Sequence, residues 1–297
     1  MKTPKVTLSH TNKVWFPQSH ITKGEIFAYY EKIAPYMLPF IKNRPLTLQR
    51  APNGITGEIF YQKDTPDYFP SWIKITAITK KSGGKTSYIT CSKTDCLLYL
   101  VNQGCITPHA WLSRTDKPTK PDRMVFDLDP SGKATFKKVK EIAHELKKIL
   151  EYYHLTSYPM ITGSRGIHVI VPIKRLYTFT QVKKSALLIA HELIKKMPDH
   201  ATLEVRIAKR GNKIFIDTLR NCYAQTGIIP YAVRLYEKAP VAVPLSWDEL
   251  GKISSAQEYT IKTILKQLKD NPHPWPNFFK KAGSLVAIFK IGTKKVH

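Results

Sequence analysis

The feature that most constrains the fold is a pair of aspartates, Asp127 and Asp129, within the otherwise apolar residues 124–129. The segment predicts a β-strand, and because side chains alternate along a strand, both carboxylates project from the same face. The core-facing positions are Met124, Phe126 and Leu128. Two carboxylates roughly 6–7 Å apart repel by on the order of 2.5 kcal/mol at an effective dielectric constant of about 20. A divalent cation would remove that repulsion, and Pro130 places the pair at a strand end that ligands can reach.

A third aspartate, Asp217, ends a second apolar segment, residues 213–217, that also predicts a strand. The two isoleucines of this segment are expected to face the core, which leaves Asp217 on the opposite face. If the two strands are neighbours, Asp127, Asp129 and Asp217 converge as ligands for two Mg²⁺ or Mn²⁺ ions. That is the arrangement of two-metal phosphoryl and nucleotidyl transfer. The alternative for the first two aspartates is a solvated pair at a strand terminus.

Residues 162–166, Thr-Gly-Ser-Arg-Gly, form a glycine-rich loop that indicates a triphosphate site. Two glycines let the backbone approach an anion, and successive N–H groups can form a concave nest for phosphate oxygens. Arg165 adds a forked donor, and Thr162 and Ser164 add hydroxyl groups. His168 follows on a predicted strand, where it would either hydrogen-bond a phosphate or serve as an ordinary structural histidine.

Amphipathic periodicity predicts helices between these strands. Thr22 and Glu25 have the spacing of a capping box, which predicts a helix starting directly after Thr22. Apolar residues repeating over 136–153 predict a second helix, and Thr180 is expected to start a third. Helices alternating with strands indicate a mixed α/β catalytic lobe, whose predicted strands are 123–129, 166–173 and 213–217.

The charge balance indicates a polyanionic partner. Lys and Arg number 47 against 22 Asp and Glu, a formal net charge of +25. An excess of this size repels itself in the folded state, and nucleic acid binding is its usual reason. General solubility is the alternative. No apolar run approaches the ~20 residues that span a bilayer, so a membrane partner is not expected.

The N-terminal segment is polar and lacks the pattern of a signal peptide, and the four cysteines show no CxxC pair. Both observations favour a reduced, cytoplasmic protein, associated with the nucleoid if it binds DNA. Cys96, Cys105 and His109 could share a zinc ion, although their spacing matches no common zinc module.

The three motifs occur in the order DLDP, TGSRGIHV and FIDTLRN, and together they resemble those of the archaeo-eukaryotic primase superfamily. The closer resemblance is to the polymerase domain of bacterial DNA ligase D and its stand-alone archaeal relatives. It extends over nearly the whole chain through the segments KVWFP, ITKGE, RPLTLQR, IFYQKD, WLSRTDKPTKPDRMVFDLDP, AKRGNKIFIDTLRN, PYAVR and PLSWDEL.

The resemblance implies a role for each matching residue. The metal ligands match the aspartates Asp127, Asp129 and Asp217. The positions that hold the incoming nucleotide match Asn12, His109, Thr162, Ser164, Arg165, His168, Arg210, Arg220 and Arg234. The DNA contacts match Lys13 and Lys23, which would grip a 5′-phosphate together with free N–H groups of the first helix turn, and Phe60 and Tyr61, which would stack on template bases. Three positions depart from the family: Arg165 stands where Lys is common, Thr162 where Ser is common, and Tyr61 where a second Phe is common.

The resemblance also implies an α+β archaeo-eukaryotic primase fold, with a catalytic lobe resembling an RNA-recognition sheet and a packed N-terminal α/β lobe. We expect one polymerase domain over 1–297, with lobes at 1–117, 118–240 and 241–297. The implied reaction is template-directed transfer of NTP or dNTP to a 3′ end, filling short gaps in non-homologous end joining with a preference for ribonucleotides and manganese. The implied partners are DNA with 5′-phosphorylated gaps or ends, Ku, and an ATP-dependent DNA ligase in the same or a separate chain.

Three alternatives use parts of the same pattern. A replicative-type primase would use the same carboxylates, but it usually carries a zinc element. A metal-dependent nuclease has no use for a triphosphate loop. A non-enzymatic nucleic-acid-binding protein would explain the charge but not three convergent aspartates.

Overall fold

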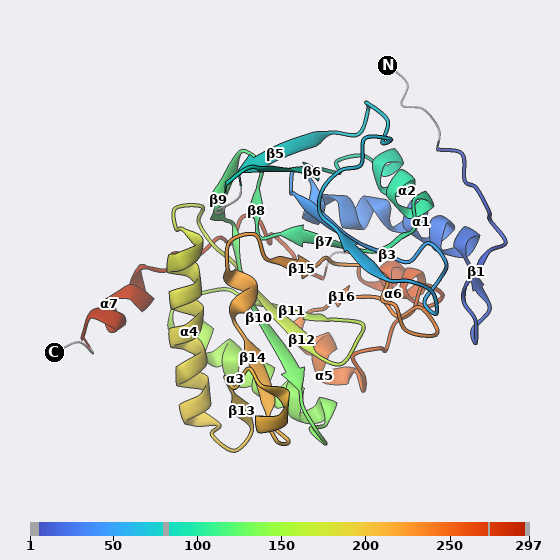
Figure 1. The fold of residues 1–297 in the computed structure, drawn as a ribbon. Helices are drawn as coiled ribbons and strands as arrows, with labels where there is room; N and C mark the ends of the chain where they lie inside the picture. Colours follow the sequence, from blue (N-terminus) through green and yellow to red (C-terminus); the bar gives the residue numbers. More distant parts are fainter. Residues whose placement is uncertain (1–5, 80–82, 273, 295–297) are drawn as a thin grey trace. The chain divides into compact units, whose positions relative to one another are not determined.

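The computed structural model describes residues 6–79, 83–272 and 274–294 (Figure 1). The chain divides into two compact units. The first comprises Met1–Pro118, Thr226–Ala242 and Tyr259–Pro272, and the second comprises Thr119–Gln225, Val243–Glu258 and His273–His297. The predicted arrangement of one domain with three lobes stays a prediction.

The second unit is built on a six-stranded sheet in the order β13-β14-β10-β12-β11-β16. All pairs are antiparallel except β13 with β14, which is parallel. The elements of this unit are β10 (Arg123–Pro130), α3 (Phe136–Tyr152), β11 (Tyr158–Ile161), β12 (Ile167–Pro172), α4 (Phe179–Lys196), β13 (Ala201–Thr202), η1 (Ile207–Lys209), β14 (Ile214–Asp217), η2 (Leu219–Asn221), β16 (Val243–Pro244), α5 (Trp247–Lys252) and α7 (Val286–Lys294).

Helices α3 and α4 pack on each other and on β10, covering one face of this sheet (Figure 1). The apolar periodicity of residues 136–153 explains α3, because Val139, Ile142 and Leu146 are fully buried. The predicted start of the third helix at Thr180 was wrong. The helix begins at Phe179, where the side chain of Thr178 caps the backbone N–H of Gln181 and Gln181 caps in return.

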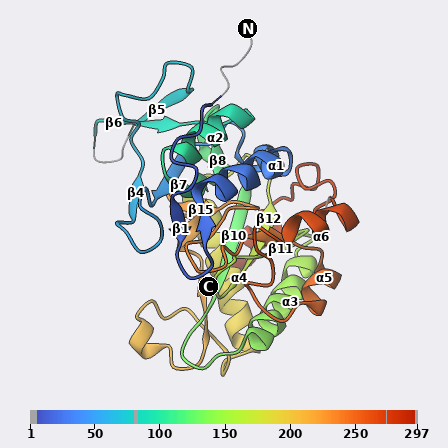
Figure 2. The same ribbon diagram turned by 90° about the vertical axis from the view of Figure 1, so that its right-hand side faces the viewer.

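The first unit contains a four-stranded sheet in the order β15-β7-β3-β4 and a separate hairpin, β5-β6. Figure 2 shows α1 with α2 beside it. The elements are β1 (Val14–Phe16), β2 (Ile21–Thr22), α1 (Lys23–Ile41), β3 (Leu46–Arg50), β4 (Phe60–Gln62), β5 (Ile75–Thr79), β6 (Lys85–Ile89), α2 (Thr94–Asn102), β7 (Cys105–Trp111), β8 (Ser113–Arg114), β15 (Thr226–Ile228) and α6 (Ile264–Asp270), and β9 (Lys117–Pro121) spans the unit boundary.

The capping box predicted at the start of α1 is confirmed. The Thr22 hydroxyl accepts from the Glu25 backbone, and the Glu25 carboxylate accepts from the Thr22 backbone at 2.8 Å. The zinc alternative finds no support, because among the described residues no group of three or more His, Cys, Asp or Glu is placed to hold a metal. Burial raises the pKa of Cys105 to about 12, which keeps this thiol protonated. None of the described helices is long and apolar enough to cross a membrane.

Candidate functional site

The carboxylates of the second unit lie at the centre of its sheet. Strand β10 has β12 on one side and β14 on the other (Figure 1). In this register Asp127 is the direct partner of His168 on β12 and of Asp217 on β14. The prediction that the two aspartate-bearing strands are neighbours is therefore confirmed. Asp129 lies two residues further along β10, opposite Phe215.

Two basic side chains lie beside the buried Asp127. The Nε2 atom of His168 lies 3.3 Å from Oδ1 of Asp127, and Nε of Arg220 lies 3.4 Å from Oδ2. The same Arg220 nitrogen lies 3.6 Å from Oδ2 of Asp217, so one guanidinium bridges two carboxylates. Burial alone would raise the pKa of Asp127, but His168 and Arg220 outweigh it and lower the pKa to about 2.

The other two carboxyl groups are shifted in the opposite direction. Burial, with the negative charge of Asp127, raises the pKa of Asp129 to about 6. Burial also raises the pKa of Asp217, while a hydrogen bond from the Leu219 N–H to Oδ1 opposes the rise. Repulsion among the three carboxylates is thus only partly compensated by the protein's own cations, which is the condition that favours binding of a further cation.

The three carboxylates are chemically suitable ligands for a hard divalent cation. Asp127, Asp129 and Asp217 offer only oxygen, which Mg²⁺ and Mn²⁺ prefer. However, no group of three or more His, Cys, Asp or Glu side chains among the described residues already has the geometry of a metal site. Arg220 occupies the space between two of the carboxylates.

The loop at residues 162–166 connects β11 to β12, and it is shaped by Thr162. The buried Thr162 hydroxyl donates to the Gly166 carbonyl and accepts from the N–H groups of Ser164 and Gly166 at 3.3 Å each. Gly163 has a φ of +66°, in the left-handed region that glycine adopts without strain. The exposed Arg165 donates to the carbonyl of Pro130 at the end of β10. Thr162 therefore forms the loop rather than pointing out of it.

Gly166 is required at this point because of its close approach to β10. A Cβ atom on Gly166 would collide with the Leu128 carbonyl oxygen and would lie 3.4 Å from Oδ1 of Asp129. The loop predicted to bind phosphate and the carboxylate at the end of β10 are therefore immediate neighbours.

Arg210, another nucleotide-binding candidate, is held within its own loop. Its Nε donates to the Glu204 carbonyl and its guanidinium donates to the Val205 carbonyl, both at 2.8 Å. The guanidinium carbon lies 3.8 Å from the centroid of the Phe215 ring. In this conformation Arg210 stabilises the segment before β14.

Asn221 contributes to the site and was not predicted from the sequence. It is fully buried; its Oδ1 accepts from the Val125 N–H at 2.8 Å, and its Nδ2 donates to the Val125 carbonyl at 2.7 Å. Nδ2 also donates to the Thr218 carbonyl at 2.9 Å. These bonds fix the turn that carries Arg220 against β10. The sequence signal for Asn221 is a polar residue that follows the apolar strand β14 after a short turn.

Lys13 and Lys23, in the first unit, are joined through the backbone. The Lys23 N–H donates to the Lys13 carbonyl at 2.8 Å. Lys23 is buried, its Nζ donates to the Ser9 hydroxyl at 3.2 Å, and burial together with the charge of Lys13 lowers its pKa. Lys13 is exposed and donates to Oδ1 of Asn53 at 2.6 Å. Two ammonium groups therefore repel each other here, as at a site for an anion.

The expectation that free N–H groups of the first helix turn complete this pocket was wrong. The N–H of Lys23 donates to Lys13, that of Gly24 donates to the Thr11 carbonyl at 2.9 Å, and that of Glu25 donates to the capping hydroxyl. Asn12 lies exposed in the preceding turn, where its Oδ1 accepts from the Thr11 hydroxyl at 3.4 Å.

The sheet of the first unit carries three more candidates. Tyr61 on β4 makes an edge-to-face contact with His109 on β7, with ring centroids 5.8 Å apart. Phe60 instead lies beneath Arg50, whose guanidinium carbon is 5.3 Å from the centroid of the Phe60 ring. Arg234, a further candidate of this unit, lies outside the sheet. It is half-buried, and its backbone N–H donates to the Pro240 carbonyl at 2.8 Å.

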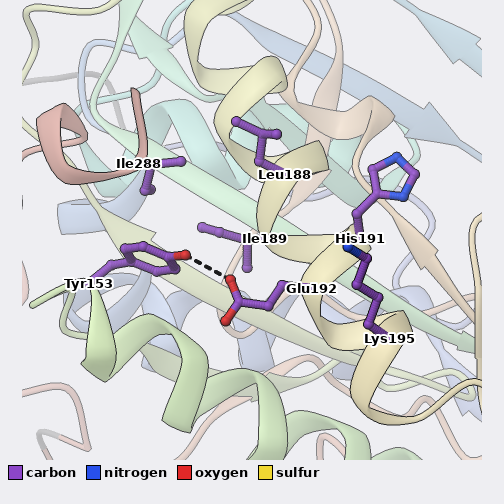
Figure 3. A pocket seen from close by; sticks show the side chains of 7 residues that line it. All are labelled: Tyr153, Leu188, Ile189, His191, Glu192, Lys195 and Ile288. Atoms are coloured by element: carbon purple, nitrogen blue, oxygen red, sulfur yellow. Dashed lines mark hydrogen bonds between the residues drawn. The ribbon is translucent and has the colours of Figure 1, made fainter. Parts of the chain in front are cut away.

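A cavity of about 220 Å³ elsewhere in the second unit contains none of the candidates (Figure 3). It lies among α4, α7 and the residue after α3, and the Tyr153 hydroxyl donates to Glu192 across it at 2.7 Å (Figure 3). Its lining residues are Tyr153, Leu188, Ile189, His191, Glu192, Lys195 and Ile288. This cavity is therefore separate from the candidate residues.

Comparison with known proteins agrees with the site geometry. The family model described as "LigD, primase-polymerase domain" matches residues 22–275. The "Bifunctional non-homologous end joining protein LigD" of Bacillus subtilis is 31% identical over 278 residues, which cover 93% of this chain and 44% of that protein. The "Multifunctional non-homologous end joining protein LigD" of Mycolicibacterium smegmatis is 34% identical over 249 residues, which cover 83% of this chain and 32% of that protein. The chain thus spans less than half the length of these relatives.

A solved structure, "Polymerase Domain from Mycobacterium tuberculosis Ligase D in complex with DNA", superposes with a TM-score of 0.88 at 27% identity. The match covers 94% of this chain and 99% of that one. The expected archaeo-eukaryotic primase fold is confirmed by this match. The chain belongs to the LigD primase-polymerase domain family, whose members are DNA-directed nucleotidyltransferases.

Proposed function

We propose that this protein extends 3′ ends on a DNA template and fills short gaps at double-strand breaks, as a polymerase of non-homologous end joining. The observation that carries this proposal is the juxtaposition of Asp127, Asp217 and His168 on three adjacent strands, in a chain of this family. Non-homologous end joining is the process named for both full-length relatives. The match to a polymerase domain in complex with DNA supports DNA as the substrate.

Two divalent cations, Mn²⁺ or Mg²⁺, would be held by Asp127, Asp129 and Asp217. When bound, such ions lower the pKa of the attacking 3′-hydroxyl and neutralise the leaving pyrophosphate. His168 and Arg220 keep Asp127 ionised and oriented.

The triphosphate of NTP or dNTP is assigned to the loop at residues 162–166 with its Arg165, next to Asp129. Ser164, Arg210, Arg220 and His168 are our further candidates for contacts to the triphosphate. Asn12, His109 and Arg234 stay predicted nucleotide contacts. We assign Tyr61 to stacking on the template.

The protein's preferences and partners belong to the same proposal. We propose a preference for ribonucleotides and manganese, and cooperation with Ku and an ATP-dependent DNA ligase in the same or a separate chain. We also propose a cytoplasmic location, associated with the nucleoid, where chromosomal DNA would be the substrate. The net charge of +25 supports binding to the DNA backbone.

The direct test is extension of a gapped, 5′-phosphorylated duplex with each nucleotide pool and with each metal. We expect template-directed addition that is fastest with ribonucleotides and Mn²⁺. Asp127→Ala should abolish addition and leave DNA binding intact, because lysines on phosphates carry the affinity. Extension by this variant above a few per cent would remove Asp127 from the catalytic centre.

A second test separates gap filling from generic polymerisation. The protein should bind a gapped duplex with a 5′-phosphate more tightly than one with a 5′-hydroxyl, because the repelling pair Lys13 and Lys23 gains a dianion. Lys13→Ala should erase that difference and still extend a simple primer-template. Lys42→Ala, at the other end of α1, is the matched control and should keep the preference. Equal affinity of the unmodified protein for the two ends would count against break repair.

A further inference from the structure

The two adjacent aromatic residues of β4 belong to opposite faces of the sheet. Strand β4 pairs with β3 so that Phe60 is opposite Arg50 and Tyr61 is opposite Gln49. Strand β3 pairs in turn with β7, so that Thr47 is opposite His109. Side chains alternate, so Tyr61 shares a face with His109 and Phe60 shares the other face with Arg50. The measured contacts of both aromatic rings agree with this register. The two rings therefore cannot act as one stacking platform.

Arg50 is held rigidly on the Phe60 face. Its Nε donates to the Gln103 carbonyl at 2.8 Å, and its Nη1 donates to Oε1 of Gln62 at 2.6 Å. Nη1 also donates to the Tyr68 hydroxyl at 3.2 Å. The guanidinium plane thus connects Phe60 on the edge strand to Tyr68 on the following loop.

Tyr68 is exposed and supported from behind. Its surface is 62% accessible, whereas the neighbouring Phe69 is only 8% accessible. Their rings meet edge to face at 5.1 Å, and Phe69 meets Tyr99 in the same way at 5.1 Å. Trp72 also meets Tyr99 edge to face, with ring centroids 5.5 Å apart. A large exposed ring on a buried aromatic base is fixed in place, so it loses little conformational entropy when a ligand stacks on it.

We propose that Arg50, Phe60 and Tyr68 form a second base-stacking site, which binds an unpaired DNA strand. This inference rests on the proposed function and adds a contact that is separate from Tyr61. Flat aromatic rings joined by a guanidinium are the platform on which successive bases of a single strand stack. Bases inside a duplex have both faces covered by their neighbours, so an overhang or the single strand of a gap is the matching ligand.

The electrostatics of the surroundings favour stacking as the main source of affinity. Arg50 supplies a cation at the centre of the site, and the chain carries a net charge of +25. The nearby Asp67 is exposed, and the Asp64 carboxylate accepts from the Ser87 N–H at 2.7 Å. These acids offset part of the local positive charge. The contribution of the Tyr68 ring should depend little on salt, because stacking on a neutral ring forms no ion pair, unlike a phosphate contact.

The test measures the affinity of the full chain for a fluorescently labelled duplex with a 5′ overhang of thymidines and for the same duplex with blunt ends. Tyr68→Ala should weaken binding to the overhang substrate at least about fivefold, with the same ratio at low and high salt, and should leave blunt-end binding unchanged. Tyr68→Phe keeps the ring and loses only the hydroxyl, so it should bind like the unmodified protein. Tyr152→Ala removes another tyrosine that is 73% exposed and is the matched control.

Two results would overturn the stacking site. One is overhang binding by Tyr68→Ala that equals that of the unmodified protein. The other is an equal loss in Tyr68→Phe, which would assign Tyr68 to positioning Arg50 through its hydroxyl. Gap extension by the unmodified protein distinguishes failure of the stacking site from failure of the proposed polymerase function. If extension is present and Tyr68→Ala has no effect, only the stacking site fails; if extension is absent, the proposed function fails.

Discussion

Replacing Asp129 with asparagine should stabilise the metal-free protein at neutral pH and abolish nucleotide transfer. Burial and the charge of Asp127 raise the pKa of Asp129 from 3.8 to about 6. Each pKa unit corresponds to about 1.4 kcal/mol, so the ionised carboxylate costs the fold about 3 kcal/mol above the higher value. An amide of the same shape carries no charge, and Asp129→Asn should recover that amount.

The pH dependence has a definite sign. Because the pKa is raised in the folded state, the folded protein takes up a proton at a higher pH than the unfolded chain does. The stability that comes from protonated Asp129 is fully present below pH 3.8 and is lost as the pH rises through about 6. The advantage of Asp129→Asn should therefore be greatest above that pH, fall to about half near pH 5, and approach zero only below about pH 3.

The assay is thermal unfolding in EDTA at about pH 7.5 and about pH 5. At roughly 2 °C per kcal/mol, the variant should melt about 6 °C above the unmodified protein at the higher pH. Asp199→Asn, at an exposed aspartate of the same unit, is the control and should show no such difference. A variant that is no more stable at pH 7.5, or an advantage independent of pH, would refute the reasoning. Added Mn²⁺ should raise the melting temperature of the unmodified protein more than that of the variant.

Two further substitutions test the loop and the turn. Arg165→Ala should raise KM for every nucleotide alike and leave base selectivity unchanged in steady-state kinetics, because phosphate contacts carry no base information; altered selectivity at a normal KM would place the loop elsewhere. Asn221→Ala removes three hydrogen bonds from a fully buried position and should lower the free energy of unfolding by about 3 kcal/mol in denaturant titration. An unchanged denaturation midpoint would show that water replaces the amide.

The catalytic strands could be predicted because their signals are local. Alternation of apolar and acidic residues is sufficient to predict the face on which Asp127 lies. A terminal aspartate in a second apolar run was enough to suggest that β14 pairs with β10, and Pro130 marked the strand end. The capping box at Thr22 was equally local, since both partners lie within one helical turn. The start of α4 was missed because Thr178 and Thr180 are both chemically suitable caps, and only Thr178 has Gln181 three residues later.

Non-local contacts could not be predicted. Phe60 and Tyr61 lie on opposite faces because side chains alternate along a strand, but which face each ring takes depends on the register of β4 against β3, which no pattern within three residues fixes. Satisfaction of the first helical N–H groups by the preceding turn depends on how residues 10–13 fold back on α1. The attachment of Arg210 to its loop likewise depends on the path of that loop, and a sequence match records only that a guanidinium is present.

The contrast between Asp127 and Asp129 follows from where the ladder of β10 and β12 ends. The paired residues of these strands run to Leu128 opposite Ile167, so Asp127 has a neighbouring strand on each side and Asp129 does not. Asp127 therefore meets both His168 and Arg220, which hold its pKa low. Asp129 lies beyond the last pair, beside the glycine loop, and its pKa is raised. Among the described residues, the carboxylate that lacks a close basic partner is thus Asp129, next to the loop assigned to the triphosphate. A cation shared between a phosphate oxygen and Asp129 would relieve repulsion that the protein itself leaves uncompensated.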